Sequence, residues 1–522
     1  MVRRFIGILI ILSWVTGMYS YDASEEEKNI SLSLQDCIVK AMENNLGVAV
    51  EMLTPQAKEY GISLAKEKFL PSMSVDTQFT DQEQASYSFL DAAGVLKTNY
   101  NQFNLSINQQ IPTGGSFSLS LDSSRYDTNR TGITVNPSYR SQLSFDFTQP
   151  LLKNFGTTMA RREILIAQTN LGVSEQELKR ALQETVYSVE EAYWNLVFAA
   201  DNLKVARLSL KLAQDLLEKN KRAVEIGTMA PIEIVSAQAQ VASREANILA
   251  AETAVKNNED RLKLVINLNA EAPEADLLTI IPSDKPIYED KEINLKEAVA
   301  FALQNRPDLK SSRLGLENYS LNLRYAKNQL LPSLDLRASY WSPGVSGDLL
   351  ILNPDDPFGP PIGSIPGGRS DSFKDVFGLK FKNWSVGVTL DFPLNALVSR
   401  AAEAQARVDL EQALLRVKSQ EQQIYTDLKI AVRDVATNFR RINALKTARE
   451  LAEKQLEAEE EKLKVGLSTN FVVLTYQNEL ASAQSQEISA IIDYMLSLAR
   501  LNRDMGTNLD DRNIRISQFL KQ

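Results

Sequence analysis

The stretch that decides the fold is residues 331–340, which read LPSLDLRASY, together with the similar stretch LPSMSVDTQF at residues 70–79. After each Leu-Pro-Ser start, apolar and polar residues alternate. This period of two is typical of a β-strand with an apolar face and a polar face. The two stretches are separated by 261 positions (331 against 70). The two stretches therefore predict β-strands, and their similarity indicates an internal duplication. A duplicated sequence predicts a structure built from repeated units.

The duplication extends well beyond these strands. Residues 34–41 (LQDCIVKA) align with residues 295–302 (LKEAVAFA) at the same offset of 261. The offset then falls to 245 where DF at 146–147 aligns with DF at 391–392, and to 239 where Gly227 aligns with Gly466. The first copy thus carries about 22 extra residues (261 against 239), and the sequence predicts two structural repeats, residues 31–270 and 292–508. Between them, residues 271–291 contain three prolines among charged residues, and we expect a linker there.

Each copy contains one very long helical segment. No glycine or proline interrupts the chain between Ala396 and Val465, and a helix of about 70 residues would be about 100 Å long. In the first copy, Leu182, Val189 and Leu196 begin a seven-residue apolar repeat, which is typical of supercoiled helices. An ordinary antiparallel coiled-coil hairpin explains this pattern as well as a helical tunnel does.

Several other stretches also alternate with period two, over about nine or ten residues, which is the length of a transmembrane β-strand. Four expected strands are common to both copies, and the stretch 100–126 adds a further hairpin in copy one. A soluble β-sandwich remains an alternative reading of the alternation. If the strands lie in lipid, four to six of them are too few for a closed barrel, and open edges would leave backbone groups unpaired. Several chains would then share one barrel, and cyclic symmetry is the natural way to close it.

The expected elements, in chain order, are as follows. The first repeat has strands at about 71–80, 100–126 and 141–149, a long helix at 158–226 and a helix at 230–268; the second has strands at about 333–341 and 383–392, a long helix at 396–465 and a helix at 469–506. Residues 342–380 read as an extracellular loop. A phosphate-loop-like stretch at 363–370 has Arg369 in place of the lysine, and we do not assign it nucleotide binding.

Composition excludes many classes of chemistry. The 522-residue chain has no histidine and a single cysteine, Cys37, which removes Ser-His-Asp catalysis, imidazole-bound zinc and intrachain disulfides. The net charge of −9 gives no electrostatic footprint for nucleic acid. We therefore expect no enzyme, no cofactor and no metal site. A basic start followed by an apolar run predicts a signal peptide at residues 1–20, with a single anchoring helix as the alternative.

Taken together, the sequence resembles the TolC-type outer-membrane efflux family. The residues that carry the resemblance are the twin openings SLQDCIVKAMENN and NLKEAVAFALQNRPDL, the strand starts FLPSM and LLPSL, the pair DFTQPLL and VTLDFPL, and the helix turns VEIGTMAPIEIV and LKVGLSTNFVVL. The resemblance implies a mainly α-helical protein with transmembrane β-strands. Three chains would form one α-helical barrel in the periplasm and one β-barrel in the outer membrane. Four strands from each chain give twelve in the family, and the hairpin 100–126 departs from that pattern.

The resemblance also implies a function and partners. The homotrimer would conduct substrates passively, in contact with outer-membrane lipid, a periplasmic adaptor protein and an inner-membrane transporter of an efflux or type I secretion system. The helix turns at Gly227-Thr228 and Gly466-Leu467 would contact the adaptor, although a glycine there is also simply a helix C-cap. Glu233 is a candidate acid at the channel aperture; its counterpart in copy two is Val472. The alternative function is a periplasmic coiled-coil adaptor or structural protein without its own pore, and the cargo cannot be named from the sequence.

Overall fold

The computed structural model describes residues 28–86, 94–268, 278–356, 359 and 361–514, so the signal peptide expected at residues 1–20 lies outside the described residues. The described chain is mainly α-helical with two β-sheets, as the sequence predicts. None of its described helices combines the length and apolar character needed to cross a bilayer.

The chain divides into two compact units. The first contains Ser188–Glu289 and Arg440–Leu496, together with the chain up to Asn45. The second contains Leu46–Tyr187, Asp290–Phe439 and the chain from Ser497 onward. Each unit draws on both halves of the sequence, so neither coincides with a single predicted repeat.

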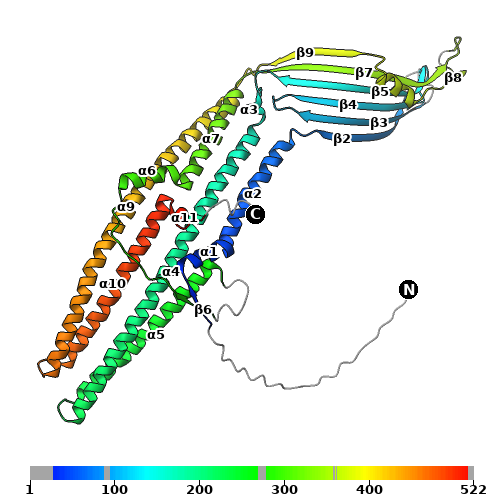
Figure 1. The fold of residues 1–522 in the computed structure, drawn as a ribbon. Helices are drawn as coiled ribbons and strands as arrows, with labels where there is room; N and C mark the ends of the chain where they lie inside the picture. The colour runs from blue at the N-terminus through cyan, green and yellow to red at the C-terminus, as the bar shows by residue number, and fades with distance from the viewer. Residues whose placement is uncertain (1–27, 87–93, 269–277, 357–358, 360, 515–522) are drawn as a thin grey trace, which may run out of the picture. The chain divides into compact units, whose positions relative to one another are not determined.

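Four long helices dominate the chain (Figure 1): α4 (Arg162–Glu225), α5 (Ile232–Ile266), α9 (Leu397–Lys464) and α10 (Asn470–Met505). The other helices are α1 (Leu34–Asn44), α2 (Leu46–Glu67), α3 (Thr157–Ala160), α6 (Leu295–Asn305), α7 (Pro307–Asn328), α8 (Arg369–Phe377) and α11 (Asn508–Asp511).

The seven-residue apolar repeat is buried where helices pack. Leu182, Val189 and Leu196 of α4 are completely buried, and Leu428 and Ile442 of α9 are as well. Such a seam stabilises a long helix because each buried side chain removes apolar surface from water.

In α9, Leu428, Val435, Ile442 and Leu456 keep the seven-residue spacing, and Arg449 interrupts it. Its guanidinium group donates to Glu487 of α10 at 2.9 Å and to Glu453 one turn further along α9 at 3.0 Å. The seam therefore contains an ion pair between the two helices at this level.

In the first unit, a small sheet anchors the start of the described chain. Strand β1 (Lys28–Leu32) pairs in parallel with β6 (Leu278–Pro282), and Ser33 and Asp36 form a capping box at the start of α1. The buried hydroxyl of Tyr193 donates to the carbonyl of Leu32 at 3.2 Å. Strand β6 lies inside residues 271–291, where the sequence predicts a linker; its pairing with β1, distant in sequence, could not be read from local composition.

The second unit contains a seven-stranded antiparallel sheet, in which six strands are long: β2 (Ser72–Ala85), β3 (Val95–Gln110), β4 (Ser116–Thr128), β5 (Val135–Pro150), β7 (Ser333–Ile351) and β9 (Asn383–Asp391). They lie side by side in that order (Figure 1), and the three-residue β8 (Gly363–Ile365) pairs with the far end of β7.

Two expectations about this sheet need correction. Most strands are longer than the nine or ten residues expected, because the backbone ladder continues beyond the alternating stretches. Residues 342–380 are not a plain loop: they contain the end of β7, β8 and α8. Helix α8 packs on the sheet, where Ser372 and Ser141 share a hydrogen bond of 2.9 Å and the Ser342 hydroxyl donates to the carbonyl of Val376.

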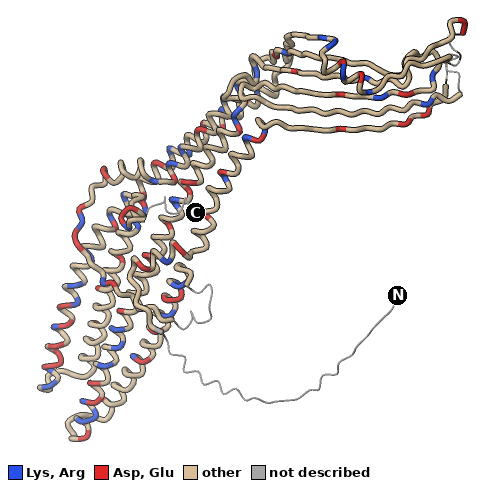
Figure 2. Tube along the Cα trace, turned by 45° about the vertical axis from the view of Figure 1, so that its right-hand side comes forward, with Lys and Arg blue, Asp and Glu red and all other residues tan. Residues whose placement is uncertain are grey.

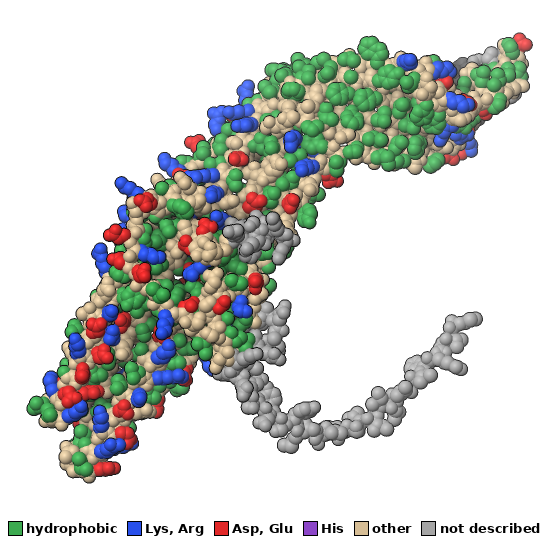
Figure 3. Space-filling view, viewed as in Figure 1, with side chains coloured by type: hydrophobic (Ala, Val, Ile, Leu, Met, Phe, Trp, Pro, Cys, Tyr) green, Lys and Arg blue, Asp and Glu red, His purple; other side chains and the backbone are tan. Residues whose placement is uncertain are grey.

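The sheet has two chemically different faces. Along each long strand, apolar side chains alternate with polar ones, and directly paired residues of neighbouring strands lie on the same face. Figure 3 shows hydrophobic side chains gathered over the strands on the visible face, and Figure 2 shows that charged residues are sparser along the strands than along the long helices. One face of the sheet is therefore suited to an apolar environment and the other to water.

Candidate functional site

The residues predicted as a docking site lie at two helix–turn–helix tips in the first unit. One tip joins α4 to α5 and the other joins α9 to α10. At the first tip, the amide of Thr228 donates to the carbonyl of Ala223 at 2.9 Å; at the second, the amide of Leu467 donates to the carbonyl of Lys462 at 2.9 Å. The two turns thus have the same hydrogen bonding, which is that of a Schellman C-cap.

Glycine is required at the same place in both turns. Gly227 and Gly466 each have φ +77°, in the left-handed region that residues with a Cβ rarely adopt. No other atom lies within 4 Å of where a Cβ would stand at either glycine. The glycines are therefore explained by the backbone of the C-cap, and the space around them is open.

The other two tip residues, Thr228 and Leu467, are both exposed. Leu467 is 79% exposed, and Thr228 donates its hydroxyl to the carbonyl of Ala223 at 2.9 Å. Leu467 thus presents an apolar side chain to solvent at the end of the hairpin.

Glu233 has a partner that the sequence does not reveal. Its Oε2 atom accepts a hydrogen bond of 3.0 Å from Nδ2 of Asn470, the first residue of α10. Asn470 is buried, and its Nδ2 also approaches the sulfur of Met229 at 3.2 Å. Glu233 is therefore half-buried and connects the two hairpins, rather than standing alone in water.

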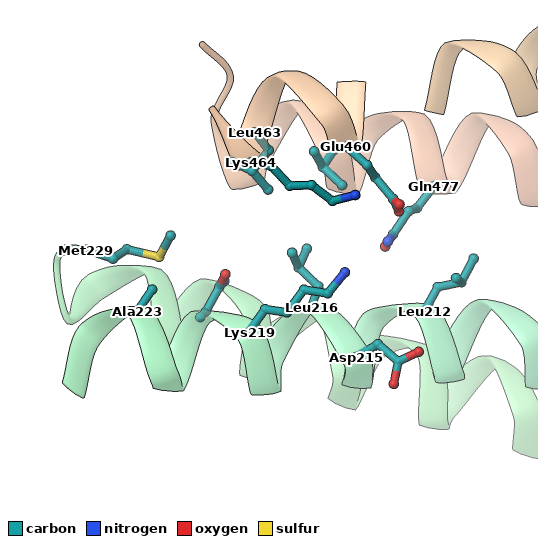
Figure 4. Close-up of a pocket in the computed structure, with 12 residues that line it drawn as sticks. Leu212, Asp215, Leu216, Lys219, Ala223, Met229, Glu460, Leu463, Lys464 and Gln477 are labelled. Atoms are coloured by element: carbon teal, nitrogen blue, oxygen red, sulfur yellow. The ribbon is translucent and has the colours of Figure 1, made fainter. Parts of the chain in front are cut away.

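A cavity of about 420 Å³ lies between the two tips (Figure 4). In Figure 4, Lys219 of α4 and Lys464 of α9 extend into the space between the hairpins, and Gln477 points from α10 toward α4. Asp215 and Glu460 also line it. The cavity therefore offers both charge signs around a partly apolar floor.

An apolar cluster forms the base of this region. Leu216 of α4 packs with residues of the other hairpin, namely Ala452, Leu456, Val473, Leu474 and Leu480. The two hairpins are thus joined by a buried core as well as by the Glu233–Asn470 hydrogen bond.

A metal site finds no candidate in the described part of the chain. Among those residues, no group of three or more acidic or cysteine side chains is arranged to hold a metal ion. Cys37 is buried, and its burial raises the pKa of the thiol to about 12, which disfavours the reactive thiolate.

Comparisons with known proteins agree with this architecture. Residues 116–268 and 299–507, more than half of the chain, match the family described as "Outer membrane efflux protein". The outer membrane protein TolC of Vibrio cholerae is 23% identical over 299 residues, which cover 56% of this chain and 60% of that protein, so the match spans less than two thirds of the relative.

Two solved structures have a similar fold. The CmeC outer membrane channel of Campylobacter jejuni has a TM-score of 0.64 at 15% identity, covering 93% of this chain and 90% of that one. The outer membrane protein VceC of Vibrio cholerae has a TM-score of 0.63 at 15% identity, covering 91% and 96%. With the family match over both halves, the resemblance inferred from the sequence is confirmed: the chain belongs to the outer membrane efflux protein family.

Proposed function

We propose that this protein is the outer-membrane channel of a tripartite efflux or type I secretion system. Three chains share one β-barrel in the outer membrane and one α-helical tunnel in the periplasm. Substrates pass through it without an energy source in the channel itself, delivered by an adaptor and an inner-membrane transporter. Family membership supports this proposal, and the sheet supplies the physical argument.

The observation that carries the proposal is a sheet with one apolar face and two free edges. In the described chain, β2 pairs with β3 alone and β9 pairs with β7 alone. In hydrocarbon, each edge would leave several backbone groups without hydrogen bonds, at several kcal/mol each. That total exceeds the ~5–15 kcal/mol of net stability typical of a folded protein. Closure with other copies of the chain removes both edges.

The direction of the strands permits this closure. β2 runs away from α2, which precedes it, whereas β9 runs toward α9, which follows it. The six long strands alternate in direction, so β2 of one copy and β9 of the next would meet antiparallel. A cyclic trimer then has the same junction three times.

A tandem duplication explains how one chain provides a matched pair of hairpins. The order of α1, α2, β2, β5, α4 and α5 along the sequence is repeated by α6, α7, β7, β9, α9 and α10, with β3 and β4 as additions. The equal φ angles of Gly227 and Gly466 support the same origin.

The two tips are the proposed contact with the periplasmic adaptor. Gly227, Thr228, Gly466 and Leu467 form exposed ends, and the cavity between the hairpins provides charges of both signs. Glu233 would contribute to a closed aperture through its bond to Asn470 rather than through an acidic ring, since Val472 occupies the matching position.

The experiment compares the channel with its alternative, a periplasmic adaptor. We expect the protein in outer-membrane fractions, as a trimer that resists dissociation in detergent, and with a stepwise conductance in planar lipid bilayers. A monomeric protein recovered from the periplasm, without conductance, would contradict the proposal and favour the adaptor.

A further inference from the structure

The extra hairpin of the first copy is a full part of the sheet. It consists of β3 and β4, which lie between β2 and β5. The pairing between β2 and β3 runs without interruption from Ser72–Asn108 to Ala85–Val95, and that between β4 and β5 from Ser116–Thr148 to Tyr126–Ser138. The hairpin therefore separates two strands that would otherwise be neighbours.

The apolar face continues across the hairpin without a break. One row of directly paired residues crosses all six long strands and is apolar or aromatic throughout: Met73, Ile107, Leu119, Phe145, Tyr340 and Trp384. The row on the opposite face, one position away, is polar throughout: Ser72, Asn108, Ser118, Asp146, Ser339 and Ser385. The hairpin thus meets the same two environments as the other strands.

Side chains on the polar face tie the hairpin to both neighbours. The hydroxyls of Ser74 on β2 and Ser106 on β3 are 2.7 Å apart, as are those of Ser120 on β4 and Ser144 on β5. Cross-strand pairs of this kind stabilise the register of neighbouring strands. They therefore fix the hairpin within the sheet, against β2 on one side and β5 on the other.

The apolar stretch also indicates how the strands tilt. The midpoint of the apolar stretch on β9 is Gly387. The row of directly paired residues that contains Gly387 reaches β3 at Gln110, through Arg337, Thr148 and Ser116. The centre of the apolar stretch on β3 is Leu105, five positions away (110 against 105). Five residues of ~3.4 Å over four strand spacings of ~4.8 Å correspond to a tilt of about 40°.

This tilt is the one expected if the apolar face lies in a membrane. A bilayer has flat boundaries, so its apolar zone crosses the rows of paired residues obliquely when strands tilt, and transmembrane strands tilt by about 35–45°. On this face, the apolar stretches of the six strands contain no charged residue. The apolar face of the hairpin therefore contacts the hydrocarbon chains of the membrane, as the apolar face of the other strands does.

We infer that the hairpin enlarges the barrel, so that three copies of six strands form an eighteen-stranded wall. This inference rests on the proposed trimeric channel. Barrel diameter grows roughly in proportion to strand number, so the barrel would be about 1.5-fold wider than one built from twelve strands. The outer-membrane section then admits solutes of a larger cross-section than a twelve-stranded barrel would.

The chain offers its own control. Deletion of residues 94–129 removes β3 and β4 and leaves β2 and β5, which run in opposite directions, to pair directly. Electron microscopy of both trimers in lipid nanodiscs measures the outer diameter of the barrel. We expect the full-length barrel to be about 1.5-fold wider than that of the deletion variant. Equal diameters would overturn the inference.

A second measurement leaves the hairpin intact. Leu119→Cys and Ser118→Cys place a thiol on opposite faces of β4, and Cys37 is buried. We expect a fluorophore at position 119 to be quenched by brominated lipid chains and position 118 to react with a water-soluble maleimide. If the hairpin fills the lumen, position 119 escapes lipid quenching and the inference fails while trimers and conductance persist. Loss of trimers and conductance in the full-length protein would instead refute the proposed function.

Discussion

Glu233 and Asn470 lie on different helical hairpins and are joined by a hydrogen bond of 3.0 Å from the Asn470 amide to the Glu233 carboxylate. Each lies in the first turn of the helix that follows a tip glycine: Glu233 in α5 and Asn470 in α10. This bond and the apolar cluster around Leu216 hold the tips of one chain together.

Replacing the amide by an acid tests this link. Asn470→Asp places a second carboxylate in a buried position beside Glu233, where like charges repel and burial adds to the cost. We expect the tips to separate more often, so that the open fraction in single-channel recordings rises. The matched control is Asn470→Ala, which removes the bond without adding charge and costs about 1 kcal/mol. An open fraction in Asn470→Asp no greater than in Asn470→Ala would contradict a repulsive contact at this site.

The proposed role of the tips in partner binding can be tested with a substitution that leaves the fold intact. Leu467→Asp changes a side chain that is 79% exposed, so we expect an unchanged trimer. Binding to the adaptor should weaken by at least about tenfold because a charge replaces an apolar contact, which is measurable by surface plasmon resonance. Leu451→Asp, on the exposed face of α9 away from the tip, serves as the control. Equal affinities for the two variants would remove Leu467 from the adaptor contact.

The second unit contains a partly buried ion pair with a pH signature. Arg306 donates two hydrogen bonds to Asp308, at 3.0 and 2.7 Å. Burial opposes ionisation, but the guanidinium group outweighs it and lowers the pKa of Asp308 below its ordinary value. A depressed carboxyl pKa stabilises the folded state above pH ~4, and this contribution is lost as the pH falls through the folded value.

We expect Asp308→Asn to lower the free energy of unfolding by about 2 kcal/mol at pH 7 and by less at pH 3, measured by chemical denaturation. The comparison variant is Asp201→Asn, whose partner Lys204 is 78% exposed, and which should change stability by less than about 0.5 kcal/mol. A loss at pH 3 equal to that at pH 7 would rule out the ion pair as its cause.

Cys37 should be chemically inert in the folded protein. Its burial, with a smaller effect from Asp36 and Asp284, raises the pKa of the thiol to about 12. The folded state therefore disfavours the thiolate, and its stability falls as the pH rises above the ordinary value of about 9. We expect maleimide labelling at pH 8 to be at least about 100-fold slower than in urea. Thr475→Cys, at an exposed position of α10, should label at once. Rapid labelling of Cys37 in the folded trimer would show that α1 is not packed as described.

The sequence predicted the features that are local in origin. Alternation after Leu331 and Leu70 identified the strands, and the absence of glycine and proline between Ala396 and Val465 identified α9. The tip glycines could be recognised because a left-handed C-cap favours this residue.

What the sequence could not provide were pairings between distant segments. The insertion of β3 and β4 between β2 and β5 depends on backbone ladders over tens of residues, and β6 pairs with a strand about 250 positions earlier. The role of Asn470 is not predictable from the sequence for the same reason. No local pattern distinguishes an asparagine that donates a hydrogen bond to Glu233 of the other hairpin.

A disulfide between the free edges of the sheet would show whether copies of the chain share one barrel. Within one chain, β2 and β9 lie at opposite edges of six strands, about 24 Å apart. Closure and a tilt of about 40° place Thr77 of β2 near Val386 or Val388 on β9 of the next copy. We expect that Thr77→Cys combined with Val386→Cys or Val388→Cys, oxidised in outer membranes, gives covalent trimers on non-reducing gels. Monomers alone in both double variants would contradict it.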